Sequence, residues 1–363
     1  MVPGKIYLYF YLVAIIRIIL FPFSILYGII NFVRNKLFDW NIFKSSSFEV
    51  PIISIGNLSV GGTGKTPHVE YLIRLLKDRF AVATLSRGYK RRSKGFILAD
   101  RNSSPEILGD EAFQFKSRHP GVEVAVDEKR VHGVAKLIEK VNGLEVVLLD
   151  DAFQHRWIRP GLSILLTDFY HLYSSDYMLP TGRLREFRSG ARRADIIVVT
   201  KTPAVLSPIT RQRVMDQLKP EADQSLYFSY IQHGELRGIP GVEFIPDQDY
   251  GNHTVLLLAG IANPYPLELN LKNKCARLER IYFPDHHMFT KGDIERVIRT
   301  FNRILSKSKI IVTTEKDMVR LLHPELLEMV RYLPICFVPM EVRFHDHDKE
   351  IFEKQIINYV TNH

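Results

Sequence analysis

Residues 52–66, with the sequence IISIGNLSVGGTGKT, are the most informative part of the chain about its fold. This stretch begins with a short β-branched run, continues into a glycine-rich turn and ends in Gly64-Lys65-Thr66, where a helical pattern starts. A strand, a glycine-rich loop and a helix in this order form a phosphate-binding loop. The loop N–H groups and the helix N-terminus can then surround phosphate oxygens. The stretch therefore predicts a nucleotide-binding α/β domain.

One position departs from the usual G-x-x-x-x-G-K-[ST] pattern, because Ser59 stands where the first glycine is expected. Gly61 and Gly62 still permit a close approach of the backbone to a ligand. We expect the Lys65 ammonium to reach the β- and γ-phosphates and the Thr66 hydroxyl to bind Mg²⁺. A Gly-Lys-Thr turn without function is the alternative, which the flanking strand and helix disfavour. The predicted nucleotide-binding residues are Ser59, Val60, Gly61, Gly62, Thr63, Gly64, Lys65 and Thr66.

Short apolar runs alternate with helix-length segments along most of the chain. Continuous apolar strands separated by helices indicate a parallel sheet that is covered on both faces. After residue 205 the alternation loosens, and two runs separated by glycines, 226–231 and 242–245, predict a β-ribbon linker. The predicted strands lie at 52–55, 82–85, 122–126, 146–149, 163–167 and 196–200, and again at 255–259, 310–314 and 336–338.

The predicted fold class is α/β, with a parallel sheet of the P-loop NTPase type, a smaller C-terminal α/β domain and an N-terminal membrane-associated helix. A length of 363 residues agrees with two domains, at roughly 100–200 residues each. The predicted units are a membrane-associated segment at 1–33, a P-loop kinase core at 34–225, the β-ribbon linker at 226–250 and a C-terminal α/β domain at 251–363.

Composition excludes several classes of protein. A hydrophobic fraction of 46% and a charged fraction of 25% are ordinary globular values, so the chain is not disordered or collagen-like. Two cysteines, Cys275 and Cys336, are too few for a disulfide framework and lack the spacing of a zinc site. The net charge of +9 suits nucleic acid, an anionic membrane surface or a phosphorylated substrate, and no nucleic-acid recognition motif accompanies it.

Residues 6–33 form an apolar stretch in which Arg17 is the one charge. About 20 apolar residues cross a bilayer, but Arg17 and Pro22 both weaken a simple spanning helix. A signal peptide is disfavoured, because the apolar region is long and no small-residue cleavage site follows it. Arg34 and Lys36 follow the stretch, which places the rest of the chain in the cytoplasm by the positive-inside rule. We predict membrane attachment, either spanning or monotopic, with a buried helical hairpin as the alternative.

The run at 146–149 ends in Asp150-Asp151, the form of a strand whose carboxylate holds Mg²⁺ beside the hydroxyl of Thr66. A helix cap is the alternative for these carboxylates. The predicted metal ligands are therefore Thr66, Asp150 and Asp151. After a later strand, residues 200–203 read TKTP, which has the lysine of a guanine-recognition turn but not its aspartate. ATP is therefore favoured over GTP as the nucleotide.

Several further motifs occur in a fixed order along the chain. They are GNL through GKT at 56–66, SRGY at 86–89, GDE at 109–111, DDAFQH at 150–155, PTGRLRE at 180–186, FPDHH at 283–287 and TTEKD at 313–317. Together they resemble the tetraacyldisaccharide 4′-kinases, the lipid A 4′-kinases of Gram-negative bacteria, over nearly the whole length. Two details depart from that family's pattern, because Ala152 replaces a usual glycine and Phe187 a usual proline. Neither departure removes a functional side chain.

The resemblance implies a reaction and its setting. The reaction would be ATP-dependent phosphorylation of the 4′-hydroxyl of tetraacyldisaccharide 1-phosphate, which gives lipid IVA at the cytoplasmic face of the bacterial inner membrane. The implied cofactors are ATP and Mg²⁺, and the implied partners are the glycolipid substrate and the membrane surface. No nucleic acid and no obligate protein partner are expected. The active site would lie in the cleft between the two domains.

A sugar hydroxyl is a poor nucleophile, so the site should offer a general base. The resemblance assigns this role to Asp110 and pairs it with His286, while Lys65 acts on the transferred phosphoryl group. His286 is preferred over His287 because it directly follows Asp285. A helix cap at Asp110 and ordinary surface histidines are the alternatives. By the same resemblance the substrate-binding residues are Arg87, Tyr89, Glu111, Arg130, Gln154, His155, Arg185 and Glu186, with Arg183 left open, and Lys316-Asp317 have no assigned role.

Two other classes of function compete with the lipid kinase. A membrane-associated P-loop ATPase or metallochaperone-like switch protein would use His286 and His287 as metal ligands. No clustering of cysteine and histidine around them supports this reading. A membrane-anchored nucleic-acid binder rests on net charge alone.

Overall fold

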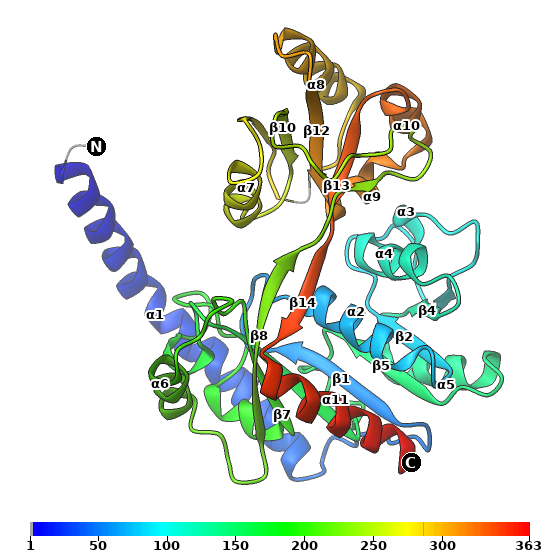
Figure 1. The fold of residues 1–363 in the computed structure, drawn as a ribbon. Coiled ribbons are helices and arrows are strands. Elements are labelled where there is room, and N and C mark those ends of the chain that lie inside the picture. Colours follow the sequence, from blue (N-terminus) through cyan, green and yellow to red (C-terminus); the bar gives the residue numbers. More distant parts are fainter. Residues whose placement is uncertain (1–2, 286) are drawn as a thin grey trace.

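The computed structural model describes residues 3–285 and 287–363, which form a larger and a smaller lobe joined by a narrow waist (Figure 1). A nine-stranded sheet forms the core of the larger lobe. Its central strands are parallel, and β1 lies between β5 and β6. In spatial order the strands are β14 (Met340–Phe344), β8 (Ser225–His233), β7 (Ile196–Thr200), β6 (Leu162–Asp168), β1 (Ile52–Asn57), β5 (Val146–Asp150), β2 (Val82–Ser86), β4 (Glu123–Val126) and β3 (Ile97–Leu98).

Both faces of this sheet are buried, because successive residues of its strands enter different cores. Ile53 and Ile55 of β1 pack in one apolar cluster, and Ile52 packs in another. Leu72 and Leu76 of α2 cover the first face, as their helical spacing predicts. The helices of the larger lobe are α2 (Lys65–Leu76), α3 (Pro105–Leu108), α4 (Asp110–Arg118), α5 (Arg130–Lys140), α6 (Pro208–Leu218) and α11 (Asp346–Thr361), with short 3₁₀ turns at Tyr173–Ser175 and Arg188–Arg193.

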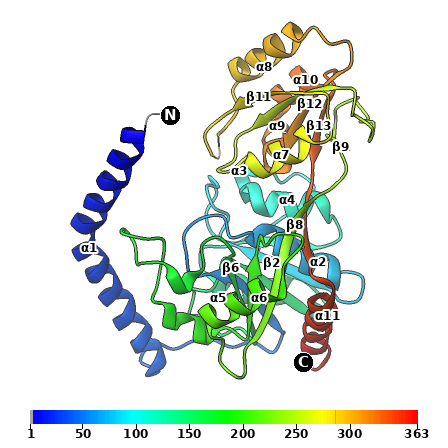
Figure 2. The same ribbon diagram turned by 60° about the vertical axis from the view of Figure 1, so that its left-hand side comes forward.

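The smaller lobe has a five-stranded sheet with its own apolar cores. Its strands, in spatial order, are β11 (Arg277–Tyr282), β10 (Thr254–Ala259), β12 (Lys309–Thr314), β13 (Ile335–Val338) and β9 (Arg237–Gly238). Its helices are α7 (Tyr265–Lys272), α8 (Lys291–Arg303), α9 (Glu315–Leu321) and α10 (Pro324–Val330). In both views α4 of the larger lobe faces this lobe across the waist (Figures 1 and 2). The α/β class predicted from the sequence is confirmed.

The C-terminal end of the chain differs from the prediction. Residues 340–363 were expected in the C-terminal domain, but β14 and α11 belong to the larger lobe. Val342 and Phe344 of β14, together with Phe352 of α11, enter the main core. The reason is that alternate residues of β14 are apolar and fit the open edge of the nine-stranded sheet.

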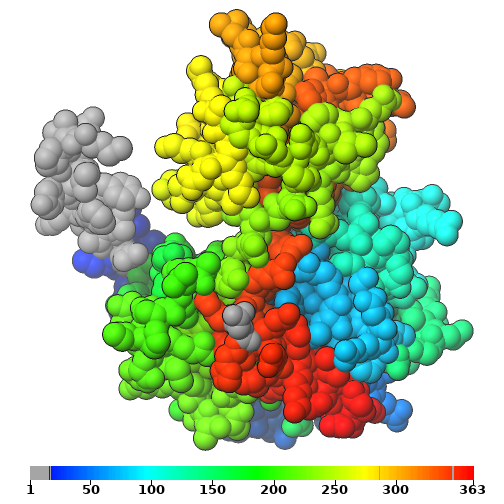
Figure 3. All heavy atoms as spheres, viewed as in Figure 1, coloured from blue at the N-terminus to red at the C-terminus, as the bar shows by residue number. Residues whose placement is uncertain are grey.

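The connection between the lobes also differs from the predicted ribbon of 226–231 and 242–245. Residues 225–228 of β8 pair with β7, and residues 229–233 pair antiparallel with β14. The ribbon therefore joins β8 to a strand far along the sequence, and its two strands cross the waist side by side (Figure 3). Residues 242–245 form no strand, and the short β9 joins the smaller sheet instead.

The N-terminal helix α1 (Pro3–Asp39) is continuous through Pro22, so the buried-hairpin alternative is wrong. Its first half projects from the larger lobe (Figures 1 and 2). The part Ile18–Asp39 is long and apolar enough to cross a membrane, and only 11% of its most apolar window is buried. The second half contacts the larger lobe through one stripe: Ser24 bonds Thr181 at 2.7 Å, and Gly28 lies against the Phe187 ring.

If α11 belongs to the larger lobe, then Phe352→Ala should destabilise that lobe. The ring is buried and stacks on Phe344 at 4.3 Å, so its loss should cost about 3–5 kcal/mol in the free energy of unfolding. The exposed neighbour Ile351 is the matched control, and Ile351→Ala should change stability by less than about 1 kcal/mol. Urea unfolding in detergent measures the stability of both variants. Hydrogen exchange of the β7 and β8 amides shows whether the loss of stability lies in the larger lobe. Faster exchange confined to the smaller lobe would contradict this placement of α11.

Candidate active site

The loop of residues 58–64 follows β1 and leads directly into α2. Gly61 (φ +113°) and Gly64 (φ +87°) have left-handed backbone conformations that L side chains rarely adopt. A Cβ built at Gly61 or Gly62 would meet nothing within 4 Å, so the loop presents bare backbone to open space. Ser59, where the pattern expects glycine, has no positive φ and therefore accommodates its side chain.

Buried side chains of the core fix the backbone of the phosphate-binding loop. Asn57 Nδ2 donates to Thr63 Oγ1 at 2.8 Å, and Thr200 Oγ1 donates to the Thr63 carbonyl at 2.8 Å. His68 Nδ1 lies 2.7 Å from the Gly64 carbonyl, and burial lowers the pKa of His68 to about 4. A neutral His68 donates this bond, so the loop keeps its shape without adding a charge beneath it.

Asp151 forms ion pairs with two cations of the site, Lys65 and Arg185. Its Oδ1 lies 3.6 Å from Lys65 Nζ and 3.0 Å from Arg185 Nη2, and both cations also contact the Asn57 side chain. Asp151 has φ +48°, which turns the chain sharply at the end of β5. Burial acts to raise the pKa of Asp151, but Lys65 and Arg185 outweigh it and hold the pKa below its usual value. Asp151 is therefore an ionised anchor for two cations that face the loop.

Asp150 differs from its neighbour, because it is buried at the end of β5 beside β1. Burial raises the pKa of Asp150 to about 7, with further contributions from the charges of Glu111 and Asp151, while Lys65 and Arg130 oppose the shift. Its Oδ1 atom is buried and has no hydrogen-bond partner among the described residues. An unpartnered buried carboxylate oxygen is costly unless a ligand or ion completes it.

This oxygen fits a magnesium site. Protein sites for Mg²⁺ commonly supply one or two oxygen ligands and leave the others to phosphate and water. In the parts of the chain that the structure describes, no three or more His, Cys, Asp or Glu side chains are grouped for a metal. Thr66, in the first turn of α2 and also buried, is the second predicted oxygen ligand. Both residues therefore suit a metal that is shared with nucleotide phosphates.

Arg87, Arg130 and His155 surround the other side of the paired aspartates. Arg130 is buried, and its Nη1 and Nη2 donate to the carbonyls of Asp127 at 2.6 Å and Asp150 at 3.3 Å. Burial lowers the pKa of Arg130 to about 10, still well above neutrality. Burial, together with the charges of Arg130 and Arg87, lowers the pKa of His155 to about 4, so His155 is neutral.

Arg87 and Tyr89 lie on the loop after β2 and are exposed, so both can reach a solute. Gln154 and Glu186 lie deeper. Gln154 Nε2 donates to the Asn57 carbonyl at 2.7 Å and to Glu186 Oε1 at 3.1 Å. Buried Glu186 also accepts from Asn35 of α1 at 3.0 Å. Glu186 thus joins α1 to the loop that carries Arg185.

Asp110 and Glu111 begin α4, on the side of the site that faces the smaller lobe. Asp110 Oδ2 accepts from Arg320 Nη2 at 3.1 Å, and Glu111 lies 3.8 Å from Lys316 Nζ. The predicted partner His286 lies outside the described residues. His287 has another role, because its Nε2 lies 2.9 Å from Asp293 Oδ2 in the capping box of α8.

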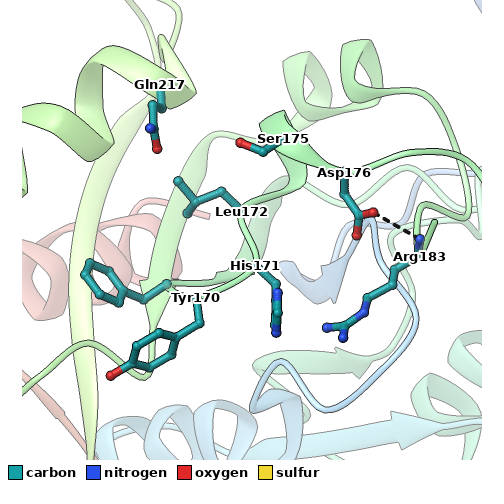
Figure 4. A pocket seen from close by; sticks show the side chains of 8 residues that line it. Tyr170, His171, Leu172, Ser175, Asp176, Arg183 and Gln217 are labelled. Atoms are coloured by element: carbon teal, nitrogen blue, oxygen red, sulfur yellow. Dashed lines mark hydrogen bonds between the residues drawn. The ribbon is translucent and has the colours of Figure 1, made fainter. Parts of the chain in front are cut away.

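A cavity of about 300 Å³ lies beside the phosphate-binding loop, and Figure 4 shows the side chains around it. Arg183 forms one wall, and its carbonyl accepts from Val60 N of the loop at 2.7 Å. Asp176 Oδ1 holds the backbone of Arg183 at 3.2 Å (Figure 4). The lining residues are Phe169, Tyr170, His171, Leu172, Ser175, Asp176, Arg183 and Gln217. The sequence analysis considered Arg183 without assigning it a role. It missed the other residues that line this cavity, because they form no motif.

Asn57 is the other residue that sequence reasoning missed. It is fully buried at the end of β1 and contacts Thr63, Lys65 and Arg185. The signal was available, because an amide directly before a phosphate-binding loop ends the strand with polar atoms that can fix that loop.

The fold and the site together define a P-loop phosphotransferase, with a glycine-rich loop, a lysine and paired aspartates at the ends of adjacent parallel strands. The family model for tetraacyldisaccharide-1-P 4′-kinase matches residues 16–361. The chain therefore belongs to the tetraacyldisaccharide 4′-kinase family, as the sequence resemblance indicated.

Individual relatives agree with the family match. A tetraacyldisaccharide 4′-kinase of Flavobacterium johnsoniae is 48% identical, with 95% of this chain and 98% of the relative covered. One of Bacteroides thetaiotaomicron is 45% identical, with 94% and 92% covered. The crystal structure of LpxK from Aquifex aeolicus in complex with ATP matches with a TM-score of 0.74 and 32% identity, covering 95% of this chain and 99% of that one.

The opposite pKa shifts of the paired aspartates predict opposite effects on stability. The pKa of Asp150 is raised from 3.8 to about 7, so its contribution to stability is present below pH 4 and is lost as the pH rises to about 7. Without nucleotide and Mg²⁺, Asp150→Asn should therefore raise the unfolding temperature at pH 8. The pKa of Asp151 is lowered, so Asp151→Asn should reduce stability at pH 8 and have less effect near pH 4. Thermal unfolding in detergent at both pH values tests this, and shifts of the same sign at pH 8 would contradict it.

Proposed function

We propose that this chain transfers the γ-phosphate of ATP to the 4′-hydroxyl of tetraacyldisaccharide 1-phosphate, giving lipid IVA. Membership of the kinase family sets the reaction, and the contacts around Asp151 supply the physical reason for it. Lys65 and Arg185 meet at this one carboxylate beside a bare glycine loop, where a transferred phosphoryl group would need positive charge. That convergence is the observation that carries the proposal.

Nucleotide binding follows from the loop. The N–H groups of residues 60–65 and the N-terminus of α2 would hold the phosphates of ATP, with Ser59 at the edge. Lys65 would leave Asp151 to meet the β- and γ-phosphates, while Arg185 would stabilise charge on the transferred group. Thr66 and Asp150 would hold Mg²⁺, with Asp151 beside them, and the ion would supply further charge neutralisation when bound.

The acceptor would approach from the side of α4. We assign Asp110 as the general base that takes the proton of the 4′-hydroxyl, because its carboxylate lies at the junction of the two lobes and the family resemblance gives it this role. His286, outside the described residues, remains the proposed partner of this base. Glu111 lies close enough to raise the pKa of Asp150 and would therefore face the same space.

The glycolipid would be bound through its phosphate and sugar hydroxyls. Exposed Arg87 and Tyr89 are the groups that can reach a substrate phosphate and ring. Arg130 and Gln154 are held by hydrogen bonds within the protein, and His155 is half-buried and neutral, so we assign all three to the wall of the substrate site. Glu186 would position Arg185, its neighbour in sequence, because its own side chain is fixed by Gln154 and Asn35.

The acyl chains would remain in the membrane that α1 contacts. Many large apolar side chains of α1 are exposed, among them Ile18, Phe23 and Ile30. The second half of the helix is tied to the larger lobe by Ser24 and Asn35, so it would lie along the protein. We therefore favour a monotopic attachment to the cytoplasmic face of the inner membrane over a simple span.

Asp110→Asn should lower kcat by roughly 10²–10⁴-fold, because it removes the proton acceptor and keeps the size. The KM for ATP should change little, since the loop and Lys65 hold the nucleotide. Lys65→Ala should abolish turnover, and exposed Asp78→Asn is the matched control with normal activity. Labelled-phosphate transfer to tetraacyldisaccharide 1-phosphate in detergent measures all three. An Asp110→Asn enzyme with unchanged kcat would move the base elsewhere, with Asp151 next to be tested.

Replacing Ile18, Phe23 and Ile30 by aspartate should release the protein from vesicles of bacterial phospholipid, because charge on this face opposes insertion. Val205, Ile245 and Leu305 are apolar residues away from α1 that are even more exposed, and their aspartate variants form the control. The control should still float with the vesicles, and both proteins should bind ATP alike. Equal loss of flotation in both would argue against α1 as the attachment.

A further inference from the structure

The TTEKD motif at 313–317 matches the family but has no role in the mechanism above. It spans the end of β12 and the start of α9, which packs against α4 across the waist. The acidic and basic side chains of α9 all have opposite charges beside them. These contacts indicate that α9 does more than fill the core.

Asp317 fixes Arg320 inside the smaller lobe. Fully buried Asp317 accepts from Arg320 Nη1 at 2.8 Å through Oδ1. Its Oδ2 accepts from Gly260 N at 2.8 Å and from Thr314 Oγ1 at 2.6 Å. Arg320 Nη1 also donates to the Gly260 carbonyl at 3.2 Å. One edge of the guanidinium is therefore held in a single orientation by Gly260, after β10, and by Asp317, in the first turn of α9.

The other edge of the same guanidinium crosses to the larger lobe. Arg320 Nε and Nη2 lie 3.2 and 3.1 Å from Asp110 Oδ2. A planar guanidinium can serve two carboxylates at once, which a lysine ammonium on a flexible stem does not reproduce. The carboxylate of Asp110 is thus connected, through one buried arginine, to the backbone of the opposite lobe.

Two further ion pairs set the register of α4 and α9. Lys316 lies 3.8 Å from Glu111, and Arg118 at the end of α4 pairs with Glu315 at the start of α9. Arg118 also pairs with Glu70 of α2, the helix that follows the phosphate-binding loop. Ion pairs therefore join α9 to residues at both ends of α4.

We propose that Arg320 is a positioning residue for phosphoryl transfer: held by Asp317, it fixes the Asp110 carboxylate in the cleft between the lobes. The inference rests on the proposed role of Asp110 as base. A base must lie within hydrogen-bond reach of the proton it takes, and small displacements of reacting groups reduce rates steeply. The TTEKD motif would then contribute to the reaction indirectly. Thr314 orients Asp317, and Asp317 orients Arg320.

Arg320→Gln should lower kcat by roughly 10–100-fold and leave the KM for ATP within about twofold, since the nucleotide loop is untouched. Arg320→Lys should retain more activity than Arg320→Gln, because it keeps a charge near Asp110. Asp317→Asn should lower kcat less than Arg320→Gln, since it disturbs only the anchor. Exposed Arg299→Gln is the matched control with normal kinetics.

A double-mutant cycle separates positioning from a structural role. If Arg320 acts through Asp110, Arg320→Gln should cause no further loss in the Asp110→Asn background. A further loss equal to the single effect would overturn the inference, and so would a full kcat in Arg320→Gln. If Asp110→Asn alone keeps full activity, the base assignment fails instead. Should Arg320→Gln not fold, Arg320→Lys in the same cycle gives the same decision.

Discussion

The ion pairs of Asp151 with Lys65 and Arg185 are the contacts on which the rest of the site depends. Asp151 directly follows β5, the strand next to β1, and its carboxylate lies 3.6 Å from Lys65 at the end of the glycine loop. It keeps two cations together before nucleotide binds, which lowers the reorganisation needed when phosphate arrives. Asp150, one residue earlier, is buried with an unpartnered oxygen and fits a metal ligand. The adjacent carboxylates thus have opposite pKa shifts, which is why we assign them different roles.

Arg185 also connects this centre to the N-terminal helix α1. Glu186 follows it and accepts from Asn35 of α1, and Phe187 lies against Gly28 of the same helix. Three consecutive residues, Arg185 to Phe187, therefore join the cation that we assign to the phosphates to the helix that we assign to the membrane. Phe187, which replaces a usual proline of the family, takes part in this contact. Its aromatic ring fills the space left by a glycine that has no side chain.

Local patterns predicted the parts of the fold that depend on neighbours in sequence. The apolar runs around 52–57 and 146–150 are strands, and Gly61 through Thr66 form the loop, because periodicity and turn chemistry are local. The return of β14 and α11 to the larger sheet was not predictable in this way. The core contacts of Val342 and Phe352 form with segments more than a hundred residues away. The strand β11 was missed because most of its side chains are polar or partly exposed.

The residues of the candidate site show the same difference between local motifs and contacts that depend on the fold. The lysine, the threonine and the paired aspartates were predicted from motifs, because each motif depends only on residues close together in the sequence. Arg320 was missed, because its function depends on a contact between α9 and α4 that only the packed lobes create. The most direct measurement of the central claim is a single turnover of the wild-type protein with labelled ATP and tetraacyldisaccharide 1-phosphate, with the product analysed by ³¹P NMR. We expect a lipid with a new phosphomonoester at the 4′ position. Release of inorganic phosphate with an unmodified lipid would contradict it.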